Sequence, residues 1–200
     1  MKNISEFLLL PFVEIEIRLG TVGQTFDPNV DTKYFSKIKE TLVNTEVPWK
    51  EICVTKTMEY ISKNTKLIEN CNKTSLMLKE NVFTKTITLD NSPFDIRFSV
   101  NQEFSLKSHI QTFSKNDTCL RKKNRTSYIS DNYRYDLTEV EETINNIKKK
   151  KNEIEIELFV NKETLTWSND YINDFLECKI YDLVNIVEKI ENKSKIELLG

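Results

Sequence analysis

"VEIEIRLG" at residues 13–20 and "NEIEIELF" at residues 152–159 both alternate charged with apolar side chains. The carboxylates at alternate positions are Glu14 and Glu16 in the first stretch and Glu153, Glu155 and Glu157 in the second. Because successive side chains of a strand point to opposite faces, each stretch predicts a β-strand with one apolar face and one stripe of carboxylates. The pattern is unusual, since glutamate is a poor strand former and carboxylates in a row repel each other.

Two interpretations of these stripes remain open at the level of the residues. In the first, both strands are half-buried and antiparallel, and their carboxylates face water. In the second, the two stripes face a common cavity that holds positive charge. Clustered carboxylates of this kind suit a hard, oxygen-preferring cation such as Mg²⁺ or Mn²⁺.

The bulk composition excludes several other classes of protein. A chain of 200 residues fits one domain, 1–200, with a sizeable core. Only three glycines occur, so a Walker A loop or a G-x-G-x-x-G dinucleotide loop is excluded. His109 is the only histidine, which excludes an H-E-x-x-H zinc site. The net charge of −2 hides strong local fields, because 30% of the residues are charged.

Targeting signals are not evident in the sequence. No apolar run approaches the roughly 20 residues of a membrane-spanning helix, and "FLLLPF" is too short for a secretory signal. The four cysteines are scattered without a close pair, which predicts reduced thiols in an intracellular, reducing compartment.

Helical periodicity appears near both ends of the chain. Residues 31–43 carry apolar side chains at helical spacing, with Asp31 as the expected cap. Residues 168–192 predict a long amphipathic helix capped near Ser168 or Asn169. Most segments between these helices look like strands, and residues 84–104 predict two strands around a turn at Asp90–Pro93. Residues 141–152 are ambiguous between a short helix and a solvated connection. The order of elements predicts an α+β domain with a large antiparallel sheet or a closed barrel.

Two further stretches carry charges on alternate positions. In "FDIRFSVNQEF" (94–104), Arg97 and Glu103 share the polar face of a predicted strand, which as a bare pattern is equally typical of a surface strand. In "CLRKKNRTSY" (119–128), one face collects three cations that suit phosphate binding, although a solvated basic loop fits the pattern as well. These cations are Arg121, Lys123 and Arg125.

A rival motif overlaps the basic stretch. Cys119 and Arg125 have the C-x₅-R spacing of cysteine phosphatases. The phosphate loop of such an enzyme wraps backbone N–H groups around the anion and normally needs glycine, whereas "LRKKN" has none. Thr118 also stands where those enzymes carry histidine. The sequence therefore gives this interpretation little weight.

Taken in order, these motifs resemble the metal-dependent RNA triphosphatases of mRNA capping, which belong to the triphosphate tunnel enzymes. The resemblance runs from about residue 13 to residue 160, through "EIEIRLG", "DIRFSVNQE", "RKKNRTSY", "YRYDLTEV" and "NEIEIEL". The Asn-, Lys- and Ile-rich composition looks most like the giant-virus branch of that family. The resemblance implies an eight-stranded antiparallel β-barrel with a charged lumen and flanking helices, including a long C-terminal helix. Both glutamate stripes would then face inward.

The resemblance also implies roles for individual residues. Glu14, Glu16 and Glu157 would bind Mn²⁺ or Mg²⁺, with Glu153 and Glu155 beside it, directly or through water. Arg97, Arg121, Lys123 and Arg125 would hold the triphosphate and stabilise its developing charge, with Lys79 and Lys66 as further cations. Glu103 would orient or deprotonate the attacking water, and Asp136 and Thr138 would brace the basic residues. Arg18 departs from the pattern, because some relatives carry lysine there.

The implied activity is removal of the terminal phosphate of triphosphate-ended RNA, the first step of mRNA capping. No K-x-D-G motif occurs in the chain, so guanylyltransferase and methyltransferase activities would come from further domains or a partner protein. A membrane partner is not expected, and a viral enzyme would work in the host cytoplasm or the virion. Two alternatives stay open: a tunnel-family phosphatase of polyphosphate, nucleoside or thiamine triphosphate, and a non-enzymatic β module that binds RNA or anions.

Overall fold

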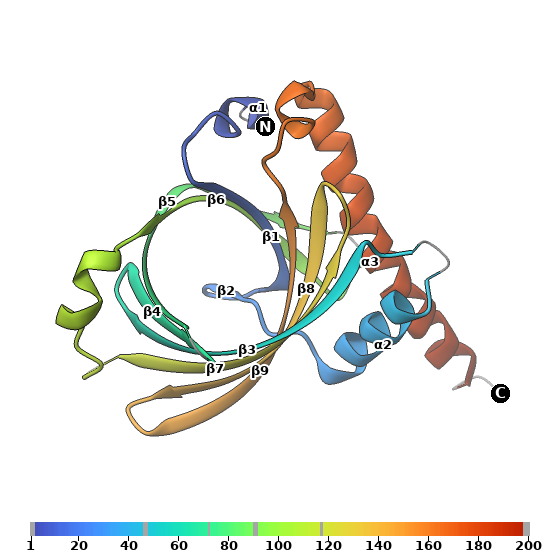
Figure 1. Ribbon diagram of the computed structural model, residues 1–200. Coiled ribbons are helices and arrows are strands. Elements are labelled where there is room, and N and C mark those ends of the chain that lie inside the picture. Colours follow the sequence, from blue (N-terminus) through green and yellow to red (C-terminus); the bar gives the residue numbers. More distant parts are fainter. Residues whose placement is uncertain (1–2, 46–47, 72, 90–91, 117, 198–200) are drawn as a thin grey trace.

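Eight antiparallel strands close into a barrel, as the resemblance predicted (Figure 1). The computed structural model describes residues 3–45, 48–71, 73–89, 92–116 and 118–197. The barrel strands are β1 (Val13–Val22), β3 (Glu51–Ser62), β4 (Thr65–Asn70), β5 (Lys73–Thr88), β6 (Asp95–Ser105), β7 (Cys119–Ile129), β8 (Tyr133–Ile144) and β9 (Ile147–Leu158). They follow the order β1-β6-β5-β4-β3-β7-β8-β9, and β9 pairs back to β1. The two-residue β2 (Phe26–Asp27) pairs with β1 alone.

The remaining elements lie outside the barrel wall. They are α1 (Ile4–Phe7), α2 (Thr32–Val43), η1 (Lys107–Thr112), η2 (Thr164–Thr166) and α3 (Asn169–Glu197). Figure 1 shows α3 running obliquely along one side of the barrel, with α2 beside it. In the described residues, no helix is long and apolar enough to cross a membrane.

The hydrophobic core lies between the barrel wall and these helices, because alternation along each strand sends apolar side chains outward and charged ones inward. Its wall side includes Ile15, Ile17 and Leu19 from β1 and Ile154 and Ile156 from β9, all at most 2% exposed. Its helix side includes Phe35, Ile38, Ile172, Leu183 and Val187. Burial of these side chains stabilises the barrel from outside, and the lumen is left to polar groups.

Both predicted helices are confirmed, with the expected caps. The Asp31 carboxylate accepts a hydrogen bond from the N–H of Lys33 at 2.8 Å, which satisfies one free donor at the start of α2. The Ser168 hydroxyl accepts from the N–H of Tyr171 at 3.2 Å at the start of α3.

The segment 141–152 is neither a short helix nor a solvated connection. It is the β8–β9 hairpin, in which Ile144 pairs with Ile147 across a two-residue turn. Asn145 and Asn146 both have positive φ, 49° and 65°, which is the conformation that a type I′ turn requires and that asparagine tolerates. The turn predicted at Asp90–Pro93 includes Asp90 and Asn91, which lie outside the described residues.

Candidate active site

The two glutamate stripes lie side by side inside the barrel. β1 and β9 pair so that Glu16 stands opposite Glu157 and Arg18 opposite Glu155. Glu14 continues the first stripe, and Glu153 continues the second. The choice left open by the sequence is therefore decided: both stripes face the lumen, where Glu16, Glu153 and Glu155 are buried.

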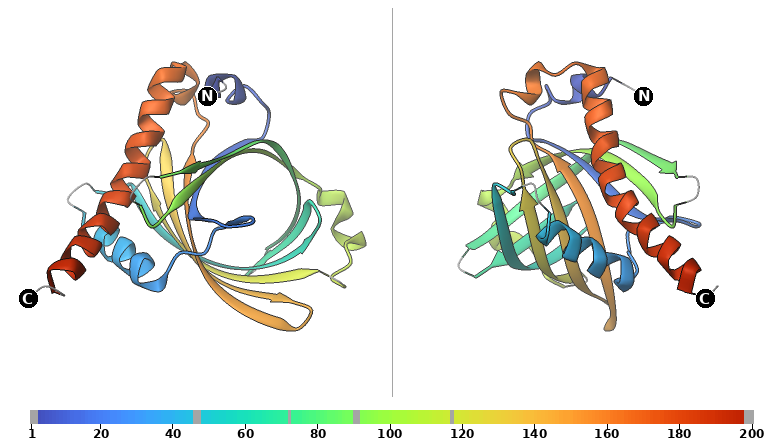
Figure 2. Two further views of the ribbon diagram at one scale, coloured as in Figure 1. Left: turned by 180° about the vertical axis from the view of Figure 1, so that it is seen from behind. Right: turned by 90° about the vertical axis from the view of Figure 1, so that its right-hand side faces the viewer.

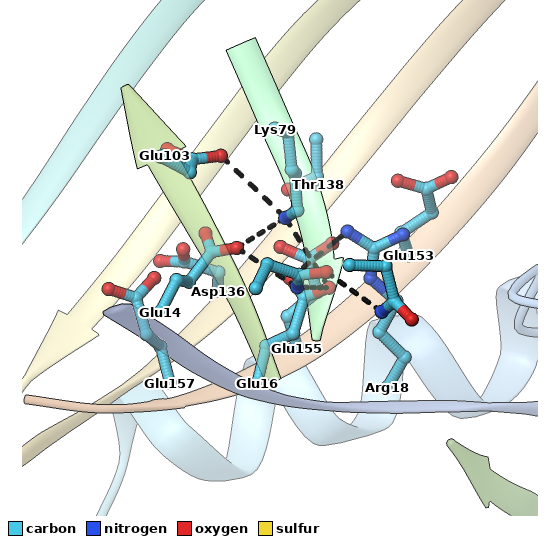
Figure 3. Close-up of polar contacts among 12 residues, drawn as sticks. Glu14, Glu16, Arg18, Lys79, Glu103, Asp136, Thr138, Glu153, Glu155 and Glu157 are labelled. Atoms are coloured by element: carbon cyan, nitrogen blue, oxygen red, sulfur yellow. Dashed lines mark hydrogen bonds and ion pairs between the residues drawn. The ribbon is translucent and has the colours of Figure 1, made fainter. Parts of the chain in front are cut away.

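Three carboxylates surround a single ammonium group in the lumen. The Nζ atom of Lys79 contacts the Glu14 carboxylate and lies 3.5 Å from Oε1 of Glu16 and 3.7 Å from Oε1 of Glu103 (Figure 3). Asn101 donates to the carboxylates of Glu14 and Glu16 at 3.4 and 3.3 Å. This point in the lumen is therefore built to hold positive charge.

Burial in the lumen disfavours the ionised form of two carboxylates, Glu14 and Glu157. It raises the pKa of Glu157 to about 7, against the attraction of Arg134 and with help from Glu14. Burial and the neighbouring Glu16 likewise raise the pKa of Glu14, against the attraction of Lys79. Both shifts mean that further positive charge near these groups would stabilise their ionised forms.

This donor set fits a hard divalent cation, since carboxylate oxygens are the ligands that Mg²⁺ and Mn²⁺ prefer. Within the described residues, however, no three His, Cys, Asp or Glu side chains form a ready metal-binding group. Lys79, Arg18 and Arg134 pair with the carboxylates instead. A metal held by Glu14, Glu16 and Glu157 remains a prediction, and it would compete with these three cations for the carboxylates.

The other two predicted metal residues, Glu153 and Glu155, are paired with arginines of the lumen. Glu153 pairs with Arg121, and Glu155 pairs with Arg18 at 2.9 Å and Arg125 at 3.1 Å. Oε1 of Glu155 has the close ion pair with Arg18 but no hydrogen bond of good geometry. Although burial alone would raise the pKa of Glu155, Arg18 and Arg125 hold it well below its usual range.

The basic strand β7 faces inward as predicted, and each of its three cations has a carboxylate partner. Besides the Arg121–Glu153 pair, Lys123 lies 2.9 Å from Glu59 on β3. Arg125 lies 2.9 Å from Asp136 and also donates from Nε to the Thr138 hydroxyl at 3.2 Å. Burial lowers the pKa of Lys123 against the pull of Glu59, and an anion beside this amine would favour its charged form.

Asp136 contacts two arginines of the lumen, Arg125 and Arg134. Its side chain is 1% exposed and accepts hydrogen bonds from the Ser127 hydroxyl and from Nε of Arg134. With the Arg125 ion pair, both of its oxygens have fixed partners, one on Oδ1 and two on Oδ2. The hydroxyl of Thr138, which is fully buried, accepts the hydrogen bond from Nε of the Arg125 guanidinium.

Glu103 lies on β6 and shares the ammonium group of Lys79 with Glu14 and Glu16. Burial would raise its pKa, but Lys66 at 2.9 Å and Lys79 lower it below its usual value. Glu103 is therefore ionised at neutral pH and can accept a hydrogen bond from water. The contact also places Lys66, which the sequence indicated only weakly, in the lumen.

Arg97 differs from the other cations of the lumen. Among the described residues it makes no ion pair, and its Nε atom is buried without a hydrogen-bond partner. Its guanidinium lies over the ring of Phe26, 4.7 Å from the centroid. Arg97 lines a cavity of about 400 Å³ inside the barrel, together with Glu16, Lys66, Lys79, Arg121 and Lys123.

Sequence reasoning missed three residues of this network. Glu59 and Arg134 complete ion pairs in the lumen, and Phe26 covers Arg97. The alternation of Thr55, Thr57 and Glu59 was the available signal for an inward face of β3. Arg134 could have been predicted, because it alternates with Asp136 and Thr138 in "YRYDLTEV". No local pattern predicts that Phe26 lies against Arg97.

The cysteine-phosphatase interpretation finds no support. Burial, with Glu142 nearby, raises the pKa of the Cys119 thiol, whereas a nucleophilic cysteine needs a lowered one. Cys119 and Arg125 lie on one strand, β7, and not on a loop. His109 lies on the exposed η1, where it contacts Ser108.

A larger hollow of about 1020 Å³ is lined by residues of α2, β3, β7, β8 and β9 and of the β4–β5 hairpin, and Lys123 lines it as well. Its polar lining is mixed in charge and includes Lys56, Lys122, Glu139 and Glu141. Neither glutamate stripe reaches it. The candidate active site is therefore the smaller cavity within the barrel.

Comparison with known proteins identifies the family. Residues 60–196 match the family model described as mRNA capping enzyme, beta chain. None of the curated protein sequences matches the chain significantly. Among solved structures, the S. pombe Pct1 RNA triphosphatase superposes with a TM-score of 0.65 at 18% identity, covering 96% of this chain and 88% of that one. The Mimivirus capping enzyme triphosphatase gives 0.61 at 16% identity, covering 91% and 95%.

The family match begins at Tyr60, after the first glutamate stripe, and the structural likeness extends the shared fold over that part. The matched range covers more than half of the chain and contains the basic strand, the bracing Asp136 and the second glutamate stripe. The chain therefore belongs to the beta-chain family of mRNA capping enzymes, the tunnel-fold RNA triphosphatases.

Proposed function

We propose that this protein is a metal-dependent polynucleotide 5′-triphosphatase, which removes the terminal phosphate of triphosphate-ended RNA in the first step of capping. One observation carries the proposal. The carboxylates of β1 and β9 meet at one wall of a closed lumen, while β7 lines another wall with Arg121, Lys123 and Arg125. Such a lumen can bind a polyanion next to the cation that balances its charge.

The balance of charge explains why a cation is needed. Each of the three β7 cations already has a carboxylate partner, so a triphosphate would add uncompensated negative charge to a buried site. A divalent ion held by Glu14, Glu16 and Glu157 would supply the compensation. When bound, that ion would polarise the phosphoryl oxygens and draw off negative charge as the anhydride breaks.

The side chains of the chain itself perform the remaining steps. Arg97, Arg121, Lys123 and Arg125 bind and align the triphosphate, and they stabilise the charge that develops during transfer. Glu103, ionised beside Lys66, orients a water molecule in line with the γ-phosphorus and takes its proton as the new P–O bond forms. The bond between the γ-phosphorus and the bridging oxygen breaks, and the RNA leaves with a 5′-diphosphate.

Further expectations rest on this proposal. Guanylyltransferase and methyltransferase activities are expected from other domains or a partner, and the 1–200 segment is expected to act as a single domain. Pct1 has been crystallised with the Spt5 CTD, which documents a protein partner for that relative. A reducing compartment is also expected, which for a viral enzyme is the host cytoplasm or the virion.

Phosphate release from triphosphate-ended RNA, with and without Mn²⁺ or Mg²⁺, tests the proposal. We expect release only with metal, loss of activity in Glu16→Ala, and retained activity in Cys119→Ser. Glu6→Ala is the matched control, because Glu6 lies on α1 outside both stripes. Release that survives a chelator but not Cys119→Ser would overturn the metal mechanism. Equal or greater activity on tripolyphosphate or nucleoside triphosphates would assign a different substrate.

A further inference from the structure

We infer that one opening of the tunnel is an RNA-reading mouth, in which Phe26 stacks on the nucleoside next to the triphosphate and Lys149 and Lys150 hold the following phosphates. This inference rests on the proposed function and adds the element that distinguishes RNA from free polyphosphate. It is built from the β1–β2 hairpin, the segment 28–30 and the start of β9.

The β1–β2 hairpin projects over this opening. Figure 2, left, shows β2 in front of the ring of strands. Asp95 accepts a hydrogen bond from the N–H of Val22 at 2.7 Å, which fixes the base of the hairpin to β6. Gly20 lets the hairpin fold this closely, because a Cβ there would lie 2.2 Å from the carbonyl of Asp27 and 2.7 Å from the Phe26 ring.

Phe26 and Arg97 form a ready-made contact pair at the mouth. The half-buried ring supports the guanidinium at 4.7 Å, and this arginine is the described lumen cation that lacks a carboxylate partner. A phosphate that reaches Arg97 from the lumen therefore arrives within one nucleotide of an aromatic ring. Aromatic rings hold bases by stacking with little dependence on sequence, as an enzyme acting on varied RNA ends requires.

A second hollow, of about 540 Å³, continues outward from Phe26. It is lined by residues 25–29 and by Lys149, Lys150 and Lys151. Lys151 pairs with Glu142 at 3.3 Å, whereas Lys149 and Lys150 are exposed and, among the described residues, without an ion-pair partner. The lining of the hollow contains these three lysines and one carboxylate, Asp27, so its charge remains positive and suits backbone phosphates.

The two walls of this hollow are joined. Val30 donates its N–H to the carbonyl of Asn152 at 2.7 Å, and the N–H of Asn152 donates to the Asn29 side chain at 3.0 Å. The lysine run is thereby held next to the segment that carries Phe26. An aromatic ring, an unpaired arginine and two free lysines in series match a nucleoside between phosphates. An acidic peptide would use the cations but leave the ring without a stacking partner.

The test compares kcat/KM for a triphosphate-ended RNA with kcat/KM for inorganic tripolyphosphate. Because tripolyphosphate has no base, Phe26→Leu should lower the RNA-to-tripolyphosphate ratio about tenfold, whereas Phe26→Trp should keep it. The Lys149→Ala/Lys150→Ala variant should lower the ratio as well. It should also reduce the slope of log affinity against log salt by ~0.7 for each lost phosphate contact with single-stranded RNA.

Two matched controls should keep the wild-type ratio. Lys148→Ala removes an exposed lysine of the same run that does not line the hollow, and Tyr181→Leu removes an aromatic ring that is 50% exposed on α3. An unchanged ratio in Phe26→Leu and in the double lysine variant would overturn the inference, as would an equal loss in the controls.

A binding measurement separates this inference from the proposed function. Fluorescence anisotropy of a labelled triphosphate-ended RNA, taken without divalent metal, should show about tenfold weaker binding by Phe26→Leu. Phe26→Leu binding as tightly as the wild type would overturn the inference even in an active enzyme. If the wild-type protein releases phosphate from neither substrate, the proposed function fails, and the anisotropy series alone decides whether the mouth binds RNA.

Discussion

At Arg125, one guanidinium meets the carboxylates of Asp136 and Glu155 and the hydroxyl of Thr138. A lysine keeps the charge, but its single ammonium group lacks the planar guanidinium that contacts all three partners at once. We therefore expect Arg125→Lys to lower kcat by about 10- to 100-fold, the range for losing a charge-assisted hydrogen bond, and Arg125→Ala to lower it further. Steady-state phosphate release measures the effect.

Lys122 provides the control for that substitution. It is the neighbouring cation on the same strand, but it points to the outer face and is exposed. Lys122→Ala should stay within about twofold of the wild type, since surface substitutions away from a site change little. A fully active Arg125→Lys would show that the arginine serves only as a positive charge.

The sequence predicted which way these side chains point but not what they touch. Alternation alone placed Arg121, Lys123 and Arg125 on one face, and the structure brings that face into the lumen. The partner of each cation comes from another strand, as with Glu59 for Lys123, and a single sequence contains no information on strand register. The sequence predicted Arg97 as a phosphate ligand. It did not predict that Phe26 would lie against Arg97, because the turn after β1 sets the position of Phe26 and the sequence did not give the geometry of that turn.

At the scale of elements, alanine substitutions at Gly20 and Gly23 of the β1–β2 hairpin should have different effects on stability. A Cβ at Gly20 would collide with the backbone carbonyl of Asp27, whereas one at Gly23 would meet nothing closer than 3.9 Å. Gly20→Ala should therefore lower the free energy of unfolding by about 1–3 kcal/mol, as overpacking does, and Gly23→Ala should change it by less than about 0.5 kcal/mol. Urea unfolding followed by fluorescence measures both.

A displaced hairpin should also affect recognition. If Gly20→Ala shifts Phe26 from the mouth, the preference for RNA over tripolyphosphate should fall in the same variant. Equal stability of the two glycine variants would show that the hairpin is not held against β1 as described.

Elements with a clear period were predictable, whereas those defined by turn chemistry were not. Residues 31–43 and 168–192 had the helical period, and the caps at Asp31 and Ser168 followed from residue type. The β8–β9 hairpin was missed because four consecutive lysines conceal strand alternation in 141–152. The Asn145–Asn146 pair, which tolerates positive φ, was the signal that could have revealed it.

At the scale of the whole molecule, bound metal should stabilise the fold. A ligand that binds only the native state at a hundredfold excess over its Kd contributes about 2.7 kcal/mol, which for a chain of this size raises Tm by about 5–10 °C. The rise on adding Mn²⁺ should shrink in a Glu14→Ala/Glu157→Ala variant. Differential scanning fluorimetry makes the measurement.

Glu6→Ala should show the same rise as the wild type, because Glu6 lies outside the lumen. A melting curve that does not respond to millimolar Mn²⁺ would mean that the glutamate stripes do not hold a metal in the free protein. Activity that still depended on metal would then assign the ion to the substrate complex.

Because β1 pairs with β9, the first strand of the barrel cannot complete its hydrogen bonds until the last strand has formed. Glu16 meets Glu157 only after the intervening strands have been synthesised and arranged, so the ring closes through contacts very distant in the chain. Such non-local pairing slows folding, and during synthesis β1 has an unpaired edge on its β9 side. A nascent chain that stops before β9 therefore holds only half of the carboxylate pair. Catalytic competence would arise in a single step with ring closure, and no partly folded chain would carry out the reaction.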